Sequence, residues 1–162
     1  MQCNYKATAG RKPGSKSIRD STSAFWILAF FPIFINHSLF SDHRYNLIND
    51  PVKEDNIVIL SEPDIVAMKL NAISTSGQRI KDFIDIYFLI DKYDLKTMLS
   101  FYCGKYNQKN DLLVLKSLIY FDDVEESEWP VMIREPDLKL KDVKRKIQKR
   151  VLDFTRQATR EK

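Results

Sequence analysis

Two amphipathic stretches, joined by a short break rich in serine, threonine and glycine, constrain the fold of this chain more than any other feature. The first predicts a helix over Glu62–Ser74, because Ser61 is a favoured N-cap and Pro63 falls in the first turn. Asp64, three residues after Ser61, is placed to return a contact in the manner of a capping box. The second stretch predicts a helix over Gln78–Lys92 from its helical spacing of apolar residues. Two consecutive helices of this kind predict a helical body.

Charged residues on these two helices form the strongest candidate site. Lys69 lies beside the apolar stripe of the first helix. A basic and acidic run opens the second helix, with Arg79, Lys81, Asp82 and Asp85. A lysine and two carboxylates brought together have the chemistry to bind the phosphates and metal of a nucleotide. The ordinary interpretation is a surface lysine with a buried stem and two acids that favour the positive end of a helix dipole. The residues alone leave both interpretations open.

The rest of the body contains one predicted strand and two further helices. Residues 56–60 (NIVIL) predict a short β-branched strand, whereas Pro51 and the charged Lys53–Asp55 predict a loop before it. Helices are predicted over Leu95–Tyr106 and Asp111–Phe121, followed by an acidic loop. The sequence therefore predicts an α+β protein that is mostly helical.

Charge is distributed unevenly along the chain. The net charge is +4 over 162 residues, but residues 41–138 carry a net −7 and residues 139–162 a net +7. Apolar residues recur at helical spacing in the basic segment, at Leu140, Val143, Ile147, Val151 and Phe154. This predicts a terminal helix that docks on the core with a basic outer face. That face has three interpretations: a solvated helix, docking on the acidic body of the chain, or contact with a polyanion such as RNA.

The first 43 residues differ in character from the rest. Residues 1–23 are basic and lack apolar periodicity, which predicts disorder. The apolar run Ala24–Ile35 is interrupted by Pro32 and is shorter than the roughly 20 residues that span a bilayer. No small-residue cleavage site follows it, which disfavours secretion, and no membrane partner is predicted. The predicted organisation has three parts: a disordered or poorly packed segment over 1–43, a helical region over 44–158, and a tail over 159–162.

The sequence lacks the common motifs of catalytic and metal centres. Neither a P-loop, a G-x-G-x-x-G, a G-x-S-x-G nor an H-E-x-x-H pattern occurs. Cys3 and Cys103 lack metal-type spacing, and the two histidines, His37 and His43, lack a zinc-type arrangement. Two cysteines exclude a disulfide-dense scaffold and favour a cytoplasmic protein. No metal site is predicted from these residues.

Three runs of the sequence together resemble one known family: EPDIVAMKLNAI, RIKDFIDIYFLIDKYDL and SLIYFDDVEES. They resemble the nucleotidyltransferase AbiEii/AbiGii toxin family of type IV toxin–antitoxin systems, over about Tyr45–Phe154. In that family a strand leads into a helix of the form s-x-x-D-I-x-A-x-K-L-x-A, and a K-D-x-x-D motif opens the next helix. The resemblance implies the C-terminal helical part of a polymerase-β-like nucleotidyltransferase, preceded by a short strand-bearing segment.

The resemblance also implies an activity, ligands and partners. Complete relatives transfer a nucleotide from an NTP, in several cases to RNA such as tRNA, with Mg²⁺ as cofactor. Lys69 matches the lysine for the nucleotide's phosphates, and the K-D-x-x-D motif matches Lys81, Asp82 and Asp85. Asp82 and Asp85 are therefore the catalytic candidates, with Lys69, Arg79 and Lys81 as nucleotide-binding candidates. A cognate antitoxin is the implied partner, and the basic C-terminal helix is the candidate surface for RNA.

One defining part of the family is missing from the sequence. The catalytic motif of the family is a Gly-Gly or Gly-Ser turn followed by D-x-D, whose aspartates hold Mg²⁺ against the NTP phosphates. The only Gly-Ser, Gly14–Ser15, is followed by the apolar run, and no D-x-D occurs. We therefore expect an N-terminally truncated or disrupted member that is inactive alone. The alternative is a non-catalytic helical module that binds an antitoxin, RNA or another copy of itself.

Overall fold

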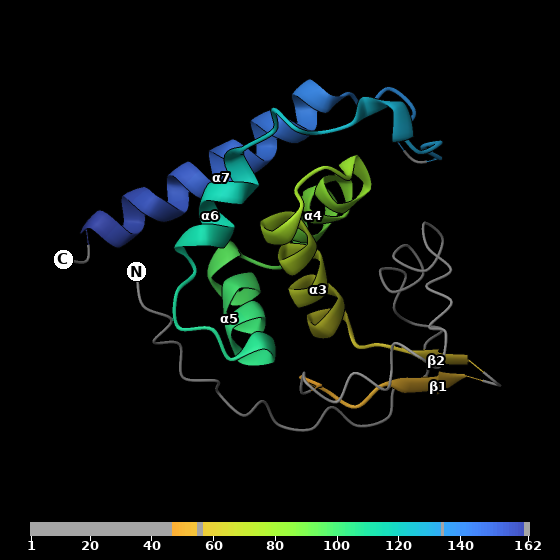
Figure 1. The fold of residues 1–162 in the computed structure, drawn as a ribbon, viewed down its shortest axis with the longest axis vertical. Helices are drawn as coiled ribbons and strands as arrows, with labels where there is room; N and C mark the ends of the chain where they lie inside the picture. The colour runs from red at the N-terminus through yellow and green to blue at the C-terminus, as the bar shows by residue number, and fades with distance from the viewer. Residues whose placement is uncertain (1–46, 55–56, 134, 161–162) are drawn as a thin grey trace.

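A short antiparallel hairpin precedes five helices in the computed structural model, which describes residues 47–54, 57–133 and 135–160 (Figure 1). In chain order the elements are β1 (Val52–Glu54), β2 (Ile57–Ile59), α3 (Glu62–Thr75), α4 (Ile80–Lys92), α5 (Leu95–Tyr106), α6 (Leu112–Ile119), the 3₁₀ turn η2 (Glu126–Glu128) and α7 (Leu140–Arg160). The mostly helical class is thus confirmed. The predictions for residues 1–43 lie outside the described residues, as do the last two residues of the tail.

The hairpin corrects one sequence prediction. The predicted strand is present as β2, but the charged segment before it is not a loop, because Lys53 and Glu54 belong to β1. The two strands pair antiparallel, with Val52 opposite Ile59 and Lys53 opposite Val58. Backbone pairing of this kind does not require apolar side chains on both strands, so a charged sequence can still form the partner strand.

Helix α3 lies at the centre of the helical body, packed against α4, α5 and α6 (Figure 1). Its buried apolar residues face several neighbours rather than one side; they are Ile65, Val66, Ala67, Leu70 and Ile73. The predicted cap is present, because Ser61 accepts a hydrogen bond from the backbone N–H of Asp64 at 3.3 Å. A helix buried on several sides holds the groups attached to it in fixed positions.

Two features fix the turn between α3 and α4: the left-handed conformation of Gly77 and the pairing of this turn with Glu125. Gly77 adopts a φ of +63°, a region that glycine enters without steric cost. Helix α4 begins at Ile80, two residues later than predicted, because Arg79 is extended and forms a parallel bridge with Glu125. The backbone N–H of Glu125 donates to the carbonyl oxygen of Gln78 at 2.9 Å. Sequence periodicity around α4 contains no sign of this pairing.

Helix α5 covers the predicted range, between two caps. The Asp94 side chain accepts from the backbone N–H of Thr97 at 2.7 Å, and Asn107 ends the helix in the left-handed conformation. Helix α6 is shorter than predicted, and Phe121 turns inward to pack on Phe83, with ring centroids 4.6 Å apart. The core therefore continues past the end of α6.

Helix α7 docks on α4 and α6 along its predicted apolar stripe (Figure 1). Val143, Ile147 and Val151 are buried. Lys146 also links α7 to α4. The ammonium of Lys146 lies 2.7 Å from the Asp91 carboxylate and 3.9 Å from the centre of the Tyr87 ring. Docking on the acidic body is thus one correct interpretation of this helix. Among the described residues, no helix is both long and apolar enough to cross a membrane.

Candidate functional site

Helices α3 and α4 bring three of the predicted site residues into direct contact. The Lys69 ammonium lies 2.8 Å from Asp82 Oδ1 and 2.6 Å from Asp85 Oδ2. Asp82 and Asp85 are three residues apart on α4 and so face Lys69 together. The side chains of Lys69 and Asp82 are only 13% and 4% exposed, whereas Asp85 is 20% exposed. Asp85 is therefore the more accessible of the two carboxylates.

The electrostatics of this cluster are unbalanced, because one ammonium faces two carboxylates. Burial disfavours the charged lysine, but the charges of Asp85 and Asp82 outweigh it and raise the pKa of Lys69. Burial also raises the pKa of Asp85, and Asp82 adds to this effect while Lys69 opposes it. Lys69 thus stays protonated at neutral pH, and the Asp85 carboxyl group is harder to ionise than an ordinary aspartate.

The two remaining site candidates differ in position. Arg79 caps the start of α4, is exposed, and lies close enough to Asp85 for its charge to lower the pKa of that carboxyl. Lys81 contacts Glu128 instead, with its ammonium 3.5 Å from Glu128 Oε2. The structure therefore places Arg79 beside the Lys69 cluster and directs Lys81 toward η2.

The cluster does not itself form a site for Mg²⁺. Both carboxylates already bind the Lys69 ammonium, which occupies the position between them. Within residues 47–54, 57–133 and 135–160, no group of three or more His, Cys, Asp or Glu side chains could hold a metal ion. Lys69 and Arg79 are the groups of this cluster that can contact an anion, and we derive no step through a metal here.

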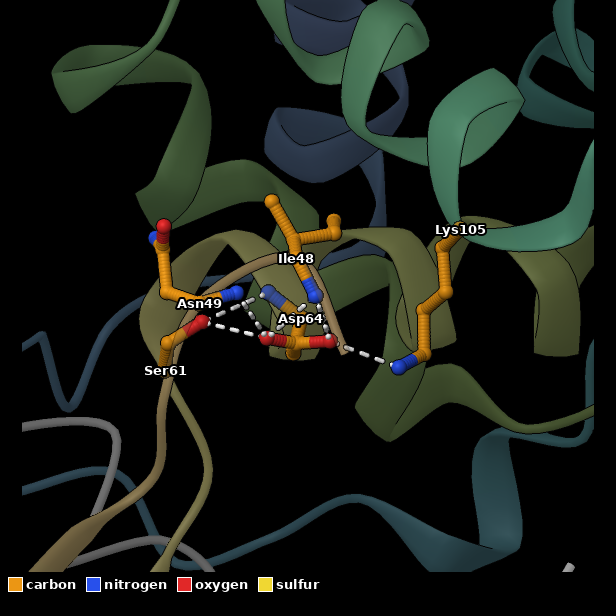
Figure 2. A network of polar contacts seen from close by, with 5 residues as sticks. All are labelled: Ile48, Asn49, Ser61, Asp64 and Lys105. Carbon is orange, nitrogen blue, oxygen red and sulfur yellow. Dashed lines mark hydrogen bonds and ion pairs between the residues drawn. The ribbon is translucent and has the colours of Figure 1, made fainter. Parts of the chain in front are cut away.

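A second lysine–aspartate contact, between Asp64 of α3 and Lys105, is not predicted from the sequence (Figure 2). Asp64 is fully buried, and its Oδ1 lies 2.6 Å from the ammonium of Lys105, whose side chain is 6% exposed. The same carboxylate accepts the backbone N–H of Ile48 at 3.0 Å, that of Asn49 at 3.3 Å, and the Ser61 hydroxyl at 2.5 Å. Although burial acts to raise the pKa of Asp64, these hydrogen bonds lower it.

This network partly corrects the predicted capping box. Ser61 caps the helix as expected, but the Asp64 carboxylate accepts from Ile48 and Asn49, more than ten residues upstream. A signal for Lys105 does exist, since it follows the buried Met98 and Tyr102 of α5 at helical spacing. A lysine on a buried face predicts an acidic partner, but the identity of that partner depends on the tertiary fold.

Comparison with known proteins agrees with the sequence resemblance. The family model for the nucleotidyl transferase AbiEii toxin of type IV toxin–antitoxin systems matches residues 39–157. An uncharacterized protein of Aquifex aeolicus (strain VF5) is 37% identical over 91 residues, which cover 54% of this chain and 44% of that relative. The matched part thus spans less than half the length of the relative. No solved structure matches the chain.

Proposed function

The chain belongs to the family of AbiEii nucleotidyl transferase toxins, and from this premise we propose that the Lys69 cluster is the phosphate-binding half of a nucleotidyltransferase site. The observation that carries the proposal is the convergence of three side chains from two consecutive helices: Lys69 of α3 contacts both Asp82 and Asp85 of α4. In this proposal the helical body is the C-terminal part of a polymerase-β-like nucleotidyltransferase.

Each residue of the cluster has a distinct part in the proposed binding. Lys69, protonated and fixed by Asp82 and Asp85, donates hydrogen bonds to a phosphate oxygen. Arg79, exposed at the start of α4, adds a second positive charge beside it. Asp85 orients the lysine and is the most exposed of the three side chains in contact, at 20%. Lys81, paired with Glu128, is the weakest of the candidates.

The same proposal holds that the chain does not transfer nucleotides alone. In complete relatives, Mg²⁺ bound by a D-x-D pair stabilises charge that develops during nucleotidyl transfer. This sequence contains no D-x-D, and both carboxylates of the Lys69 cluster already contact an ammonium. The cluster thus binds and orients, and the chemistry requires the missing pair. A cognate antitoxin is the partner that a type IV family implies.

Incorporation of labelled nucleotide into tRNA tests this function. The purified chain is incubated with Mg²⁺, each labelled NTP in turn, and tRNA. We expect no labelled tRNA above the level of a reaction without protein. Incorporation by the wild-type chain that disappears in Asp85→Asn and Lys69→Met would refute inactivity and establish an enzyme.

One specific observation favours RNA binding as a second function. The side of α7 opposite its buried stripe carries four exposed basic residues: Arg145, Lys149, Arg156 and Arg160. Arg145 is paired with Asp142, but within the described residues the other three form no ion pair. These residues extend along about 22 Å of helix, with neighbours about 6 Å apart where they are four residues apart. This spacing suits successive phosphates of a nucleic acid strand.

A matched pair of double variants tests RNA binding in the absence of any NTP. Lys149→Gln with Arg156→Gln removes two charges from the outer side of α7, and Lys109→Gln with Lys116→Gln removes two exposed charges elsewhere. If the outer side contacts phosphates, the first variant lowers the slope of log affinity against log salt by about 1.4 to 1.8, and the second leaves it unchanged. Equal slopes for both variants and wild type would exclude α7 as the binding surface.

A further inference from the structure

The Asp64 carboxylate joins three segments that are separate in the sequence. Ser61 and Asp64 belong to the start of α3, Lys105 comes from the end of α5, and Ile48 and Asn49 precede the hairpin (Figure 2). We propose that Asp64 is a positioning residue that anchors the polypeptide leading into β1 to the helical body, at a fixed place relative to the helix that carries Lys69.

The choice of an aspartate at this position follows from the groups around it. Two backbone N–H groups of residues 48 and 49 donate to the carboxylate in partly buried hydrogen bonds, outside any helix or strand that could supply a backbone acceptor. An ionised carboxylate has enough lone pairs for both amides, the Ser61 hydroxyl and the Lys105 ammonium. Because Asp64 is fully buried, water does not compete for these contacts. The leading segment is therefore attached by charge-assisted hydrogen bonds.

A simple ion pair between α3 and α5 does not account for this arrangement. Such a pair needs only Asp64 and Lys105, whereas two of the donors come from the segment before β1. Asp64 and Lys69 are five residues apart on one buried helix, about 7.5 Å along its axis. A rigid helix transmits the position of the anchored segment to the Lys69 cluster. The meaning of this anchor for catalysis rests on the proposed function, but the anchor itself does not.

Hydrogen exchange of individual amides tests the anchor in the full chain, without nucleotide or partner. Lys105→Met removes the ammonium but keeps the carboxylate, so we expect the amides of Ile48 and Asn49 to stay protected. Asp64→Ala combined with Lys105→Met removes both charges and leaves no buried unpaired lysine. In that double variant we expect the two amides to exchange about tenfold faster or more, as for loss of a hydrogen bond to a charged group.

The amides of Ile86 and Leu89 in α4 serve as the internal reference for global opening. The proposal requires that the amides of Ile48 and Asn49 accelerate by a larger factor than these α4 amides between the two variants. It is overturned if Ile48 and Asn49 exchange alike in both variants. It is also overturned if Ile48 and Asn49 accelerate only by the same factor as the α4 amides, because Asp64 would then only stabilise the whole fold.

Discussion

Helix α3 carries two lysine–aspartate contacts whose surroundings differ in every respect that matters for function. At the start of the helix, one fully buried carboxylate meets one ammonium, two backbone amides and a hydroxyl. Further along, one ammonium is shared between Asp82, which is buried, and Asp85, which is 20% exposed. The first contact satisfies its groups and lowers the pKa of Asp64, whereas the second leaves Asp85 with a raised pKa.

The difference separates a structural role from a binding role. A closed network with a favourable charge state contributes to folding and has no capacity left for a ligand. A partly exposed cluster that contains a carboxyl group with a raised pKa has perturbed electrostatics, and such groups are common at functional sites. Substitutions of the same kind at the two contacts should therefore have different effects on stability and opposite effects on its pH dependence.

The largest effect is expected from Asp64→Ala. The substitution leaves the Lys105 ammonium buried without its carboxylate and removes the acceptor of two backbone amides, which should cost about 3 to 5 kcal/mol. Urea unfolding followed by circular dichroism measures the loss. Asp64→Ala with Lys105→Met should recover part of it, because the double variant no longer buries this ammonium without the Asp64 carboxylate. A loss below about 1 kcal/mol for the single variant would show that the network is not structural.

A smaller effect is expected from Lys69→Met. Removing the ammonium leaves Asp82 and Asp85 facing each other, but Asp85 can reach solvent, so the cost should be about 1 to 3 kcal/mol. The loss should shrink as the pH falls, because the raised pKa of Asp85 lets that carboxyl group become protonated. Urea unfolding at neutral and at acidic pH measures both values. A loss as large as that of Asp64→Ala would mean that both clusters are structural.

The pH dependence of the two asparagine variants should have opposite signs. Because the folded pKa of Asp64 is lowered, its contribution is present above the unfolded value of about 3.9 and is lost as the pH falls through the folded pKa. Because the folded pKa of Asp85 is raised, its charge instead costs stability once the pH rises past that unfolded value. From acidic to neutral pH, Asp64→Asn should lose stability relative to wild type, and Asp85→Asn should gain. If the stability of both variants relative to wild type changed with pH in the same direction, the two carboxylates would not differ in their effect on folding.

The smallest effect is expected from Lys81→Ala. The Lys81–Glu128 pair is long and partly exposed, so its loss should change stability by less than about 1 kcal/mol. Nucleotide binding should also be nearly unchanged, because the ammonium points toward η2. Thermal unfolding and a binding titration of this variant check both statements. Strongly weakened nucleotide binding by this variant would show that Lys81 is part of the binding site.

The sequence predicts those features of the two contacts that depend on residue spacing within one segment. The helices, the Ser61 cap and the shared side of Asp82 and Asp85 follow from spacing along one segment. The late start of α4 does not, because it depends on pairing with Glu125. Nor does the Asp64 network, whose donors come from residue 48 on one side and residue 105 on the other. Long-range pairing of single polar groups leaves no periodic trace in a sequence.

Equilibrium binding of a fluorescent NTP tests the central claim most directly. The titration compares wild type with Lys69→Met and with Lys116→Met, which removes the same charge from the exposed side of α6. If Lys69 holds the phosphates, wild type and Lys116→Met bind alike, and Lys69→Met binds about tenfold to a hundredfold more weakly. Equal binding by all three proteins, or binding by none, would contradict a phosphate site at Lys69.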